Sequence, residues 1–271
     1  PYDKFKPWDN DTRFHKEQAF TNAKVWANGA WTKITRVIRH KTNKRLFRIS
    51  THEGTVDVTE DHSLVHANGH KIRPEECTVG QTHLLHSFPS EFTIQGSLEG
   101  DILNASYSDR QDYIQNVLTS GHLEFTSKLE AQRAYYLLRS VGYEHIKVQS
   151  SADNTFKLIL APLSSSSEII QNITELPKVH SNTFVYDLET EKGIFISGVG
   201  RLNNSNTDSL FLRFKSKDEL GNVLTGIEAL RKSRELGIDA SKNFKKLIKP
   251  PHDLEFEKIF DPFILLSKKR Y

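Results

Sequence analysis

The alternation of hydrophobic and polar residues predicts a β-rich first part of the chain. Between residues 24 and 38, apolar side chains alternate with polar ones on both sides of Asn28-Gly29, a dipeptide typical of a two-residue hairpin turn. Residues 1–22 are polar and lack periodicity, so we expect a loose lead-in. Further short strands separated by turn residues are predicted at residues 45–51, 55–59, 63–65, 71–73 and 82–87.

The middle of the chain has apolar residues at helical spacing. This spacing predicts helices over residues 108–119 and 127–141, and Gly142 should stop the second one. The serine run at 164–167 has the composition of a linker. Strands are expected at residues 147–150, 156–161, 183–188, 193–197 and 200–202.

The pattern changes again after Asn206. The tail is expected to hold two helices, at 225–236 and around 240–248, with Pro250-Pro251 breaking the second. Strands are predicted in it at residues 210–215, 255–259 and 263–266. The simplest interpretation is a β domain that is split by an α+β insertion and followed by an unrelated tail.

Composition limits the class of protein further. Hydrophobic residues make up 37% of the chain and charged residues 26%, and no run of 18 apolar residues predicts a membrane span. The first residues lack the apolar core of a signal peptide. Cys77 is the single cysteine, which excludes an internal disulfide and argues against a cysteine-based zinc site. We expect an intracellular protein, from the cytoplasm of a host cell or from a virus or phage.

Charge and the first residue leave alternatives open. The net charge of +3 is too small by itself to indicate nucleic-acid binding. The chain contains no methionine and begins with proline, which fits a removed initiator, a cut chain or a truncated one.

Several separated motifs resemble the sequence blocks of inteins, in the order of that family. Thr59 and His62 match its Thr-x-x-His pattern. Asp187 falls on its catalytic aspartate, Asn206 on its terminal asparagine and Thr207 on the first residue of the downstream extein. Each residue alone would more often be structural, so their shared order carries the resemblance.

The resemblance implies protein splicing, a single-turnover self-processing reaction that needs no cofactor. In inteins an ester formed upstream passes to the hydroxyl that Thr207 would supply here. His62 would protonate the nitrogen of the upstream scissile amide, and Thr59 would polarise the same bond. Asn206 would then attack its own carbonyl with its amide nitrogen and cut the 206–207 bond. Asp187 would coordinate the two junctions.

The chain departs from the intein pattern around the last block. Ser205 stands at the penultimate position, where the family usually has a histidine, and still belongs to the candidate site. Gly193 and Ile194 stand where another block histidine is usual. Asn203 and Asn204 replace residues that are normally apolar. These departures bear on the rate of asparagine cyclisation.

The first intein block, which carries the upstream nucleophile, is missing from this chain. Either the chain is truncated or the intein is naturally split. A split intein would need an N-terminal intein fragment, joined to the upstream polymerase extein, as its partner.

Residues 101–160 resemble the second half of a LAGLIDADG homing endonuclease. Where that family's helix ends in Gly-Asp-Gly, with a metal-binding carboxylate, this chain has Ser120-Gly121-His122. Two-metal cleavage of DNA needs both acidic positions. We therefore expect a decayed and inactive endonuclease.

The tail resembles family B DNA polymerases. Thr207-Asp208-Ser209 matches the end of the Tyr-Gly-Asp-Thr-Asp-Ser motif, in which Asp208 would be one of two palm aspartates that hold Mg²⁺. Lys268, Lys269 and Arg270 would contact the DNA backbone. The resemblance implies that splicing yields a DNA-directed polymerase, which binds nucleotide and DNA in replication and is inactive until spliced.

We therefore expect a mostly β Hint-type intein fold in residues 1–100 and 166–206. A small degenerate α+β insertion at 101–165 would interrupt it, and an α/β polymerase palm fragment would occupy 207–271. One alternative is a DNA-binding polymerase fragment with a splicing-defective intein. Another, an active homing endonuclease, is disfavoured by Gly121.

Overall fold

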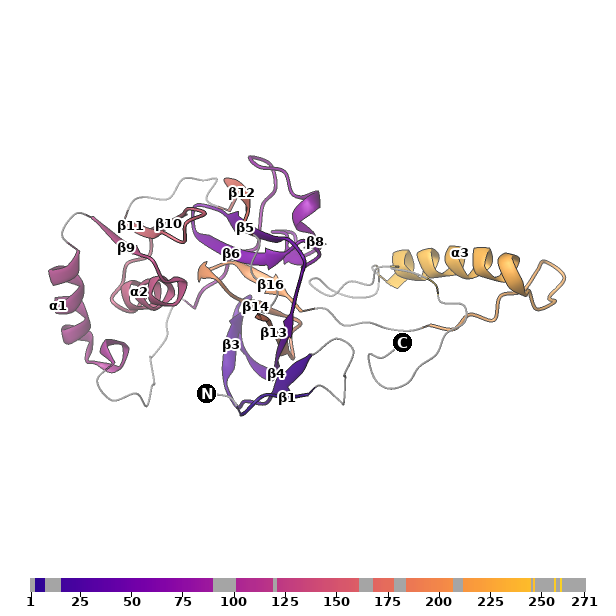
Figure 1. Cartoon of the computed structure of the whole chain (residues 1–271), viewed down its shortest axis with the longest axis horizontal. Coiled ribbons are helices and arrows are strands. Elements are labelled where there is room, and N and C mark those ends of the chain that lie inside the picture. The colour runs from indigo at the N-terminus through magenta and orange to yellow at the C-terminus, as the bar shows by residue number, and fades with distance from the viewer. Residues whose placement is uncertain are drawn as a thin grey trace.

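The structure is a computed structural model of the 271-residue chain. It describes residues 3–7, 16–89, 101–118, 121–160, 168–177, 184–206 and 212–244, with the single residues 246, 256 and 259. Strands dominate the described residues and helices are few, as predicted (Figure 1).

The first sheet is built around the long strand β4 (Ala30–Lys41). β3 (Lys24–Ala27) folds back on it through Asn28-Gly29, which both have positive φ, so the predicted hairpin is confirmed. β13 (Phe184–Thr190) pairs antiparallel with β4 and sets Asp187 opposite Ile38. The long strand thus joins segments that lie far apart in the sequence.

The start of the chain is not loose, so the prediction for residues 1–22 was wrong for its described part. β2 (Glu17–Ala19) pairs with β4, and β1 (Lys6–Pro7) pairs with β2. Ala19 is buried, and Glu17 forms an ion pair with Arg39. Strands of two or three residues are too short to show an alternating pattern, which explains the error.

The second sheet has the strand order β12-β5-β6-β15. β5 (Leu46–Ser50) and β6 (Gly54–Thr59) confirm the two strands predicted for this region and pair as a hairpin. β12 (Asn172–Glu175) pairs with β5, and β15 (Val199–Gly200) pairs with β6. The sheet carries a hydrophobic core of Ile49, Val56, Val58, Leu64, Leu84, Ile170 and Leu202.

The two segments that flank the insertion, around Leu84 and around Glu168, pair with each other. The backbone N–H of Leu84 donates to Glu168 O at 3.0 Å, and His83 forms a β-bridge with Ile169. The intervening insertion therefore has its two flanks side by side.

The third sheet has the order β14-β16-β7-β8, from β14 (Ile194–Ile196), β16 (Asn203–Ser205), β7 (Leu64–Val65) and β8 (Lys71–Ile72). β16 is internal, because β14 and β7 pair with its two edges. β7 and β8 confirm the strands predicted at 63–65 and 71–73 and pair as a hairpin. The strand predicted at 82–87 was not found, because its residues form isolated bridges to three different segments.

Described residues of the insertion fold as an α+β lobe beside the sheets (Figure 1). α1 (Tyr107–Val117) and α2 (Lys128–Ser140) confirm two predicted helices, and a serine hydroxyl caps the N-terminus of each. An antiparallel sheet of β10 (Ile146–Ser150), β11 (Phe156–Leu160) and β9 (His122–Phe125) completes the lobe. Short 3₁₀ turns lie at Ile102–Asn104 and Pro74–Glu76.

The lobe shares its hydrophobic core with the other sheets. Tyr135 and Leu138 of α2 belong to one buried cluster with Ile196 of β14 and Val199 of β15. The side-chain amide of Gln132 also accepts from the N–H of Gly200 at 2.7 Å and donates to its carbonyl at 3.3 Å. The insertion is therefore packed as part of the same body.

A buried arginine strengthens this junction. Arg48 on β5 is 2% exposed and binds the Asp57 carboxylate through two nitrogens, at 2.7 and 2.8 Å. The same guanidinium donates to Ser151 O and to Asn154 Oδ1 of the insertion, and Lys128 of α2 also pairs with Asp57. Burial alone would raise the pKa of Asp57, but the hydrogen bonds and charges of Arg48 and Lys128 lower it below its ordinary value.

In the described part of the tail, one continuous helix, α3 (Gly226–Phe244), covers positions where two helices were predicted. Gly237 lies between the two predicted helices, and a glycine weakens a helix interior by about 1 kcal/mol relative to alanine. A Cβ at Gly237 would instead collide with the ring of Phe256, so packing explains this glycine. Residues 212–215 form no strand; of the strand predicted at 255–259 only residues 256 and 259 are described, and the one predicted at 263–266 lies outside the described residues.

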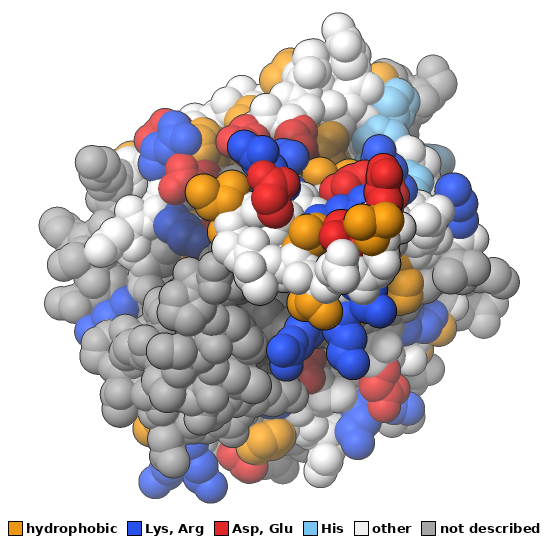
Figure 2. All heavy atoms as spheres, turned by 90° about the vertical axis from the view of Figure 1, so that its right-hand side faces the viewer, with side chains coloured by type: hydrophobic (Ala, Val, Ile, Leu, Met, Phe, Trp, Pro, Cys, Tyr) orange, Lys and Arg blue, Asp and Glu red, His pale blue; other side chains and the backbone are white. Residues whose placement is uncertain are grey.

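α3 lies apart from the sheets (Figure 1), and none of its residues is buried. Seen from the end of the molecule that carries α3, hydrophobic side chains lie among Lys, Arg, Asp and Glu side chains (Figure 2). The exposed large hydrophobic residues after position 206 are Leu212, Leu220, Val223, Ile227 and Phe244. The described tail therefore lacks a core of its own.

Arg48→Met should destabilise the chain by about 3 kcal/mol or more, because it leaves the Asp57 carboxylate buried with fewer partners. Urea unfolding followed by circular dichroism measures the loss. Arg45→Met is the control: Arg45, directly before β5, is 54% exposed in its pair with Glu60, and its loss should cost much less because exposed ion pairs contribute little to stability. Equal losses in the two variants would contradict the role given to Arg48.

Candidate functional site

β16 carries the last residues before the tail into the interior. Ser205 pairs with Ile194 of β14, and Asn204 pairs with Leu64 of β7. All four residues 203–206 are at most 6% exposed. Polar side chains at this depth need hydrogen-bond partners, because burying an unpartnered polar group is costly.

The two asparagines that replace apolar residues obtain such partners. Asn203 Nδ2 donates to Leu85 O at 3.3 Å and to Ser87 Oγ at 2.8 Å. Asn204 Nδ2 donates to Ser197 Oγ, while its Oδ1 is buried without a partner. The strand is thus held by side chains as well as by its backbone.

Asn206 is fixed by the turn that joins β13 to β14. Its backbone N–H donates to Gly193 O at 3.0 Å. Its side-chain amide satisfies both neighbours in the orientation in which Nδ2 donates to Gly193 O at 2.6 Å and Oδ1 accepts from Thr190 N at 3.2 Å. Gly193 has a φ of 71°, a conformation that favours glycine and that turns its carbonyl to this position.

The backbone carbonyl of Asn206 receives two further donors. Ser205 Oγ lies 2.9 Å from Asn206 O, closer than the 3.3 Å that separates it from Gly193 O. Lys71 Nζ, from β8, lies 3.3 Å from Asn206 O. The carbonyl of the 206–207 peptide bond is therefore polarised by two hydrogen-bond donors.

His62 lies in the connection from β6 to β7, next to this site. Its N–H donates to the carbonyl of Thr59 at 3.0 Å, and the following Ser63 O accepts from Ser205 N at 3.2 Å. Burial lowers the pKa of His62 to about 4; the nearby charge of Asp61 opposes this shift, and that of Lys71 adds to it. At pH 7 the ring is neutral and can donate one hydrogen bond.

Asp187 lies on the strand that leads into the site. Its carboxylate accepts a hydrogen bond from the N–H of Leu188 at 2.8 Å, and three residues later Thr190 provides the N–H that faces Asn206. Thr59 ends β6 on the other side of the site. His62, Ser205 and Asn206 are thus brought together, with Thr59 and Asp187 on the elements that adjoin them.

The other predicted site residues, Thr207, Asp208, Lys268, Lys269 and Arg270, lie outside the described residues. Sequence reasoning missed Lys71. A lysine at the end of a hairpin carries no signal of its own, and only the pairing of Leu64 with both Asn204 and Ile72 brings it near residue 206.

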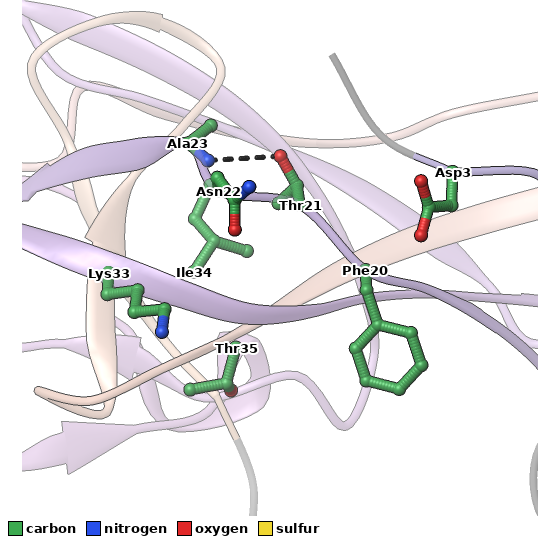
Figure 3. A pocket seen from close by; sticks show the side chains of 8 residues that line it. All are labelled: Asp3, Phe20, Thr21, Asn22, Ala23, Lys33, Ile34 and Thr35. Carbon is green, nitrogen blue, oxygen red and sulfur yellow. Dashed lines mark hydrogen bonds between the residues drawn. The ribbon is translucent and has the colours of Figure 1, made fainter.

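An open hollow lies elsewhere on the surface, between the start of the chain and β4. It is lined by Asp3 and by residues 20–23 and 33–35, whose side chains converge on it (Figure 3). The hydroxyl of Thr21 accepts from the N–H of Ala23 there at 3.1 Å. None of the predicted site residues lines it.

Two features are absent from the described part of the chain. No group of three or more His, Cys, Asp or Glu residues within it is arranged to hold a metal ion. No described helix is long and apolar enough to cross a membrane.

Comparison with known proteins relates the tail to polymerases. Residues 205–271 match the family described as DNA polymerase family B. A DNA polymerase of Pyramimonas orientalis virus is 54% identical over 65 residues, which are 24% of this chain and 5% of that protein.

A DNA polymerase of Acanthamoeba polyphaga mimivirus matches the whole chain at 29% identity. The alignment runs over 389 positions, more than the 271 residues of this chain, and the chain spans 22% of the length of that relative. Among solved structures, a transcription factor IIB Mvu mini-intein superposes with a TM-score of 0.37 at 14% identity, over 75% of this chain and 81% of that one.

His62 should titrate near pH 4 in the folded chain, as measured by NMR of its ring C–H signals. The same ring should titrate near pH 6.5 in urea. Because the unfolded chain binds the proton more tightly, the stabilisation from neutral His62 is complete above about pH 6.5 and is lost as pH falls towards 4. A folded-state midpoint near 6.5 would contradict the burial of this ring.

Proposed function

We propose that this chain is the C-terminal part of a split intein that carries out protein splicing. It excises residues 1–206 and joins the polymerase segment that begins at Thr207 to an upstream segment. The observation that carries the proposal is the environment of Asn206: its side-chain nitrogen is held by Gly193 O, and its own carbonyl receives hydrogen bonds from Ser205 and Lys71.

This geometry suits asparagine cyclisation. The reacting nitrogen and carbonyl carbon belong to one residue, so attack is intramolecular, and fixing both groups removes much of its entropic cost. The two donors stabilise the negative charge that develops on the carbonyl oxygen. His62 and Thr59 would serve the upstream junction, Asp187 would couple the junctions, and Thr207 would accept the upstream acyl group.

The extent of the matches supports a junction at residue 206. The polymerase family match begins at residue 205, beside the predicted last residue of the intein. The mimivirus polymerase aligns with the whole chain, whereas the Pyramimonas virus polymerase aligns with only 65 residues. An insertion of residues 1–206 into a polymerase, shared with one relative, explains this difference.

The tail would become functional only after splicing. An α3 without buried residues suits a palm fragment whose core is completed by the upstream polymerase. In the spliced DNA polymerase, Asp208 would help to hold Mg²⁺, and Lys268, Lys269 and Arg270 would contact DNA. The protein would act inside a cell and would derive from a virus, as two of its relatives do.

The insertion at 101–165 would be an endonuclease remnant. Gly121 precedes β9 with a φ of 74° and supplies no carboxylate for a metal ion. The insertion shares a hydrophobic core with β14 and β15, which favours a structural role in the splicing domain.

A mixing experiment tests the proposal. The chain is combined with a tagged N-terminal intein piece from a related polymerase intein, and the products are followed by mass spectrometry. Transfer of the tag to residues 207–271 is the expected result. Asn206→Ala should abolish release of residues 207–271, whereas Asn172→Ala on the exposed part of β12 should leave it unchanged.

The other outcomes separate the alternatives. Release of residues 207–271 without ligation would mean that only asparagine cleavage operates. No release despite tight association would favour the second candidate, a DNA-binding polymerase fragment whose intein is splicing-defective.

A further inference from the structure

The carbonyl oxygen of Asn206 is bound by one neutral and one charged donor. Ser205 Oγ is 2.9 Å away and Lys71 Nζ is 3.3 Å away. Ser205 has a single hydroxyl proton, and the shorter distance favours Asn206 O over Gly193 O at 3.3 Å. Lys71 therefore brings the only full positive charge that a described hydrogen bond places on this carbonyl.

The position of Lys71 is set by the fold. Lys71 pairs with Val65 in the β7–β8 hairpin, and β7 pairs in turn with β16. The long side chain spans the strand between, while its residue stays partly exposed. Its charge is also close enough to His62 to help lower the pKa of that ring, so a neutral histidine and a charged lysine occupy one site.

We propose that Lys71 is a catalytic residue for asparagine cyclisation at residue 206, acting with Ser205 as the oxyanion site. The inference rests on the proposed function. The ammonium group of Lys71 reaches the scissile carbonyl from another strand and polarises it for attack.

The step balances without a co-reactant. Nδ2 of Asn206 attacks the carbonyl carbon of the same residue, and the electron pair of the C=O bond moves to the oxygen that Lys71 and Ser205 bind. Nδ2 loses a proton as the 206–207 C–N bond breaks, and the departing nitrogen of residue 207 gains one. The products are a C-terminal succinimide at residue 206 and a free amine at residue 207.

Lys71→Met tests the role, because methionine keeps an unbranched side chain and removes the charge. Loss of one oxyanion donor typically slows a reaction by about 10²–10³-fold. In the mixing experiment, we expect release of the intein to slow by that factor while the branched ester on Thr207 accumulates. Accumulation of this ester would show that Lys71→Met still folds, binds its partner and completes the earlier steps.

Two matched variants complete the test. Lys71→Arg keeps a charged donor and should retain release within about tenfold of the unaltered chain. Lys192→Met removes a lysine one residue from Gly193 whose Nζ donates to Ala27 O at 3.4 Å, not to Asn206 O, and should release at the unaltered rate.

The outcomes are distinct. Release by Lys71→Met at the unaltered rate overturns the inference and leaves the proposed function intact. Loss of the branched ester together with release, in both Lys71→Met and Lys71→Arg, also overturns it, because Lys71 would then serve folding or partner binding. If the unaltered chain binds its partner and releases nothing, the proposed function itself fails.

Discussion

A polar strand in the interior of a sheet is the constraint on which this structure depends. β16 reads Asn-Asn-Ser, yet strands pair on both of its edges and almost no solvent reaches it. An unpartnered group there costs a desolvation penalty, and the surrounding segments supply donors and acceptors from Ser87, Ser197, Leu85 and the carbonyl of Gly193, although Asn204 Oδ1 stays without a partner. The same network that makes the strand tolerable also fixes Asn206, the residue that follows it. One set of hydrogen bonds therefore both provides partners for the buried polar side chains of β16 and holds Asn206 in place.

The supporting elements converge on that strand from distant parts of the sequence. Gly193 lies in the turn after β13, Lys71 lies in the β7–β8 hairpin, and His62 lies in the connection that follows β6. The insertion lobe contributes from outside, because α2 packs on β15 and Arg48 joins β5 to the lobe. An insertion that shares a core with the sheets is part of what holds the site together.

The sequence predicted the local elements well and the meeting of distant ones less well. The hairpin at Asn28-Gly29 and the helices α1 and α2 follow from turn chemistry and periodicity, which are local properties. The order of motifs also indicated His62 and Asn206 as candidate site residues. β2, in contrast, pairs with β4, a distant partner, and β1 pairs with β2, while the glycine inside α3 is explained by the close approach of Phe256. Lys71 could not be singled out, because its contact with Asn206 arises from the register of two strand pairs.

The adjacency of Leu84 and Glu168 has a consequence for how such proteins change over time. When the two flanks of a segment are already in contact, the length of chain between them has little effect on the stability of the sheet. The entropy of closing a loop grows only with the logarithm of its length, about 0.6 kcal/mol for each doubling. A lineage can therefore shorten or lengthen this insertion at little thermodynamic cost, provided that the part packed on α2 and Arg48 is kept.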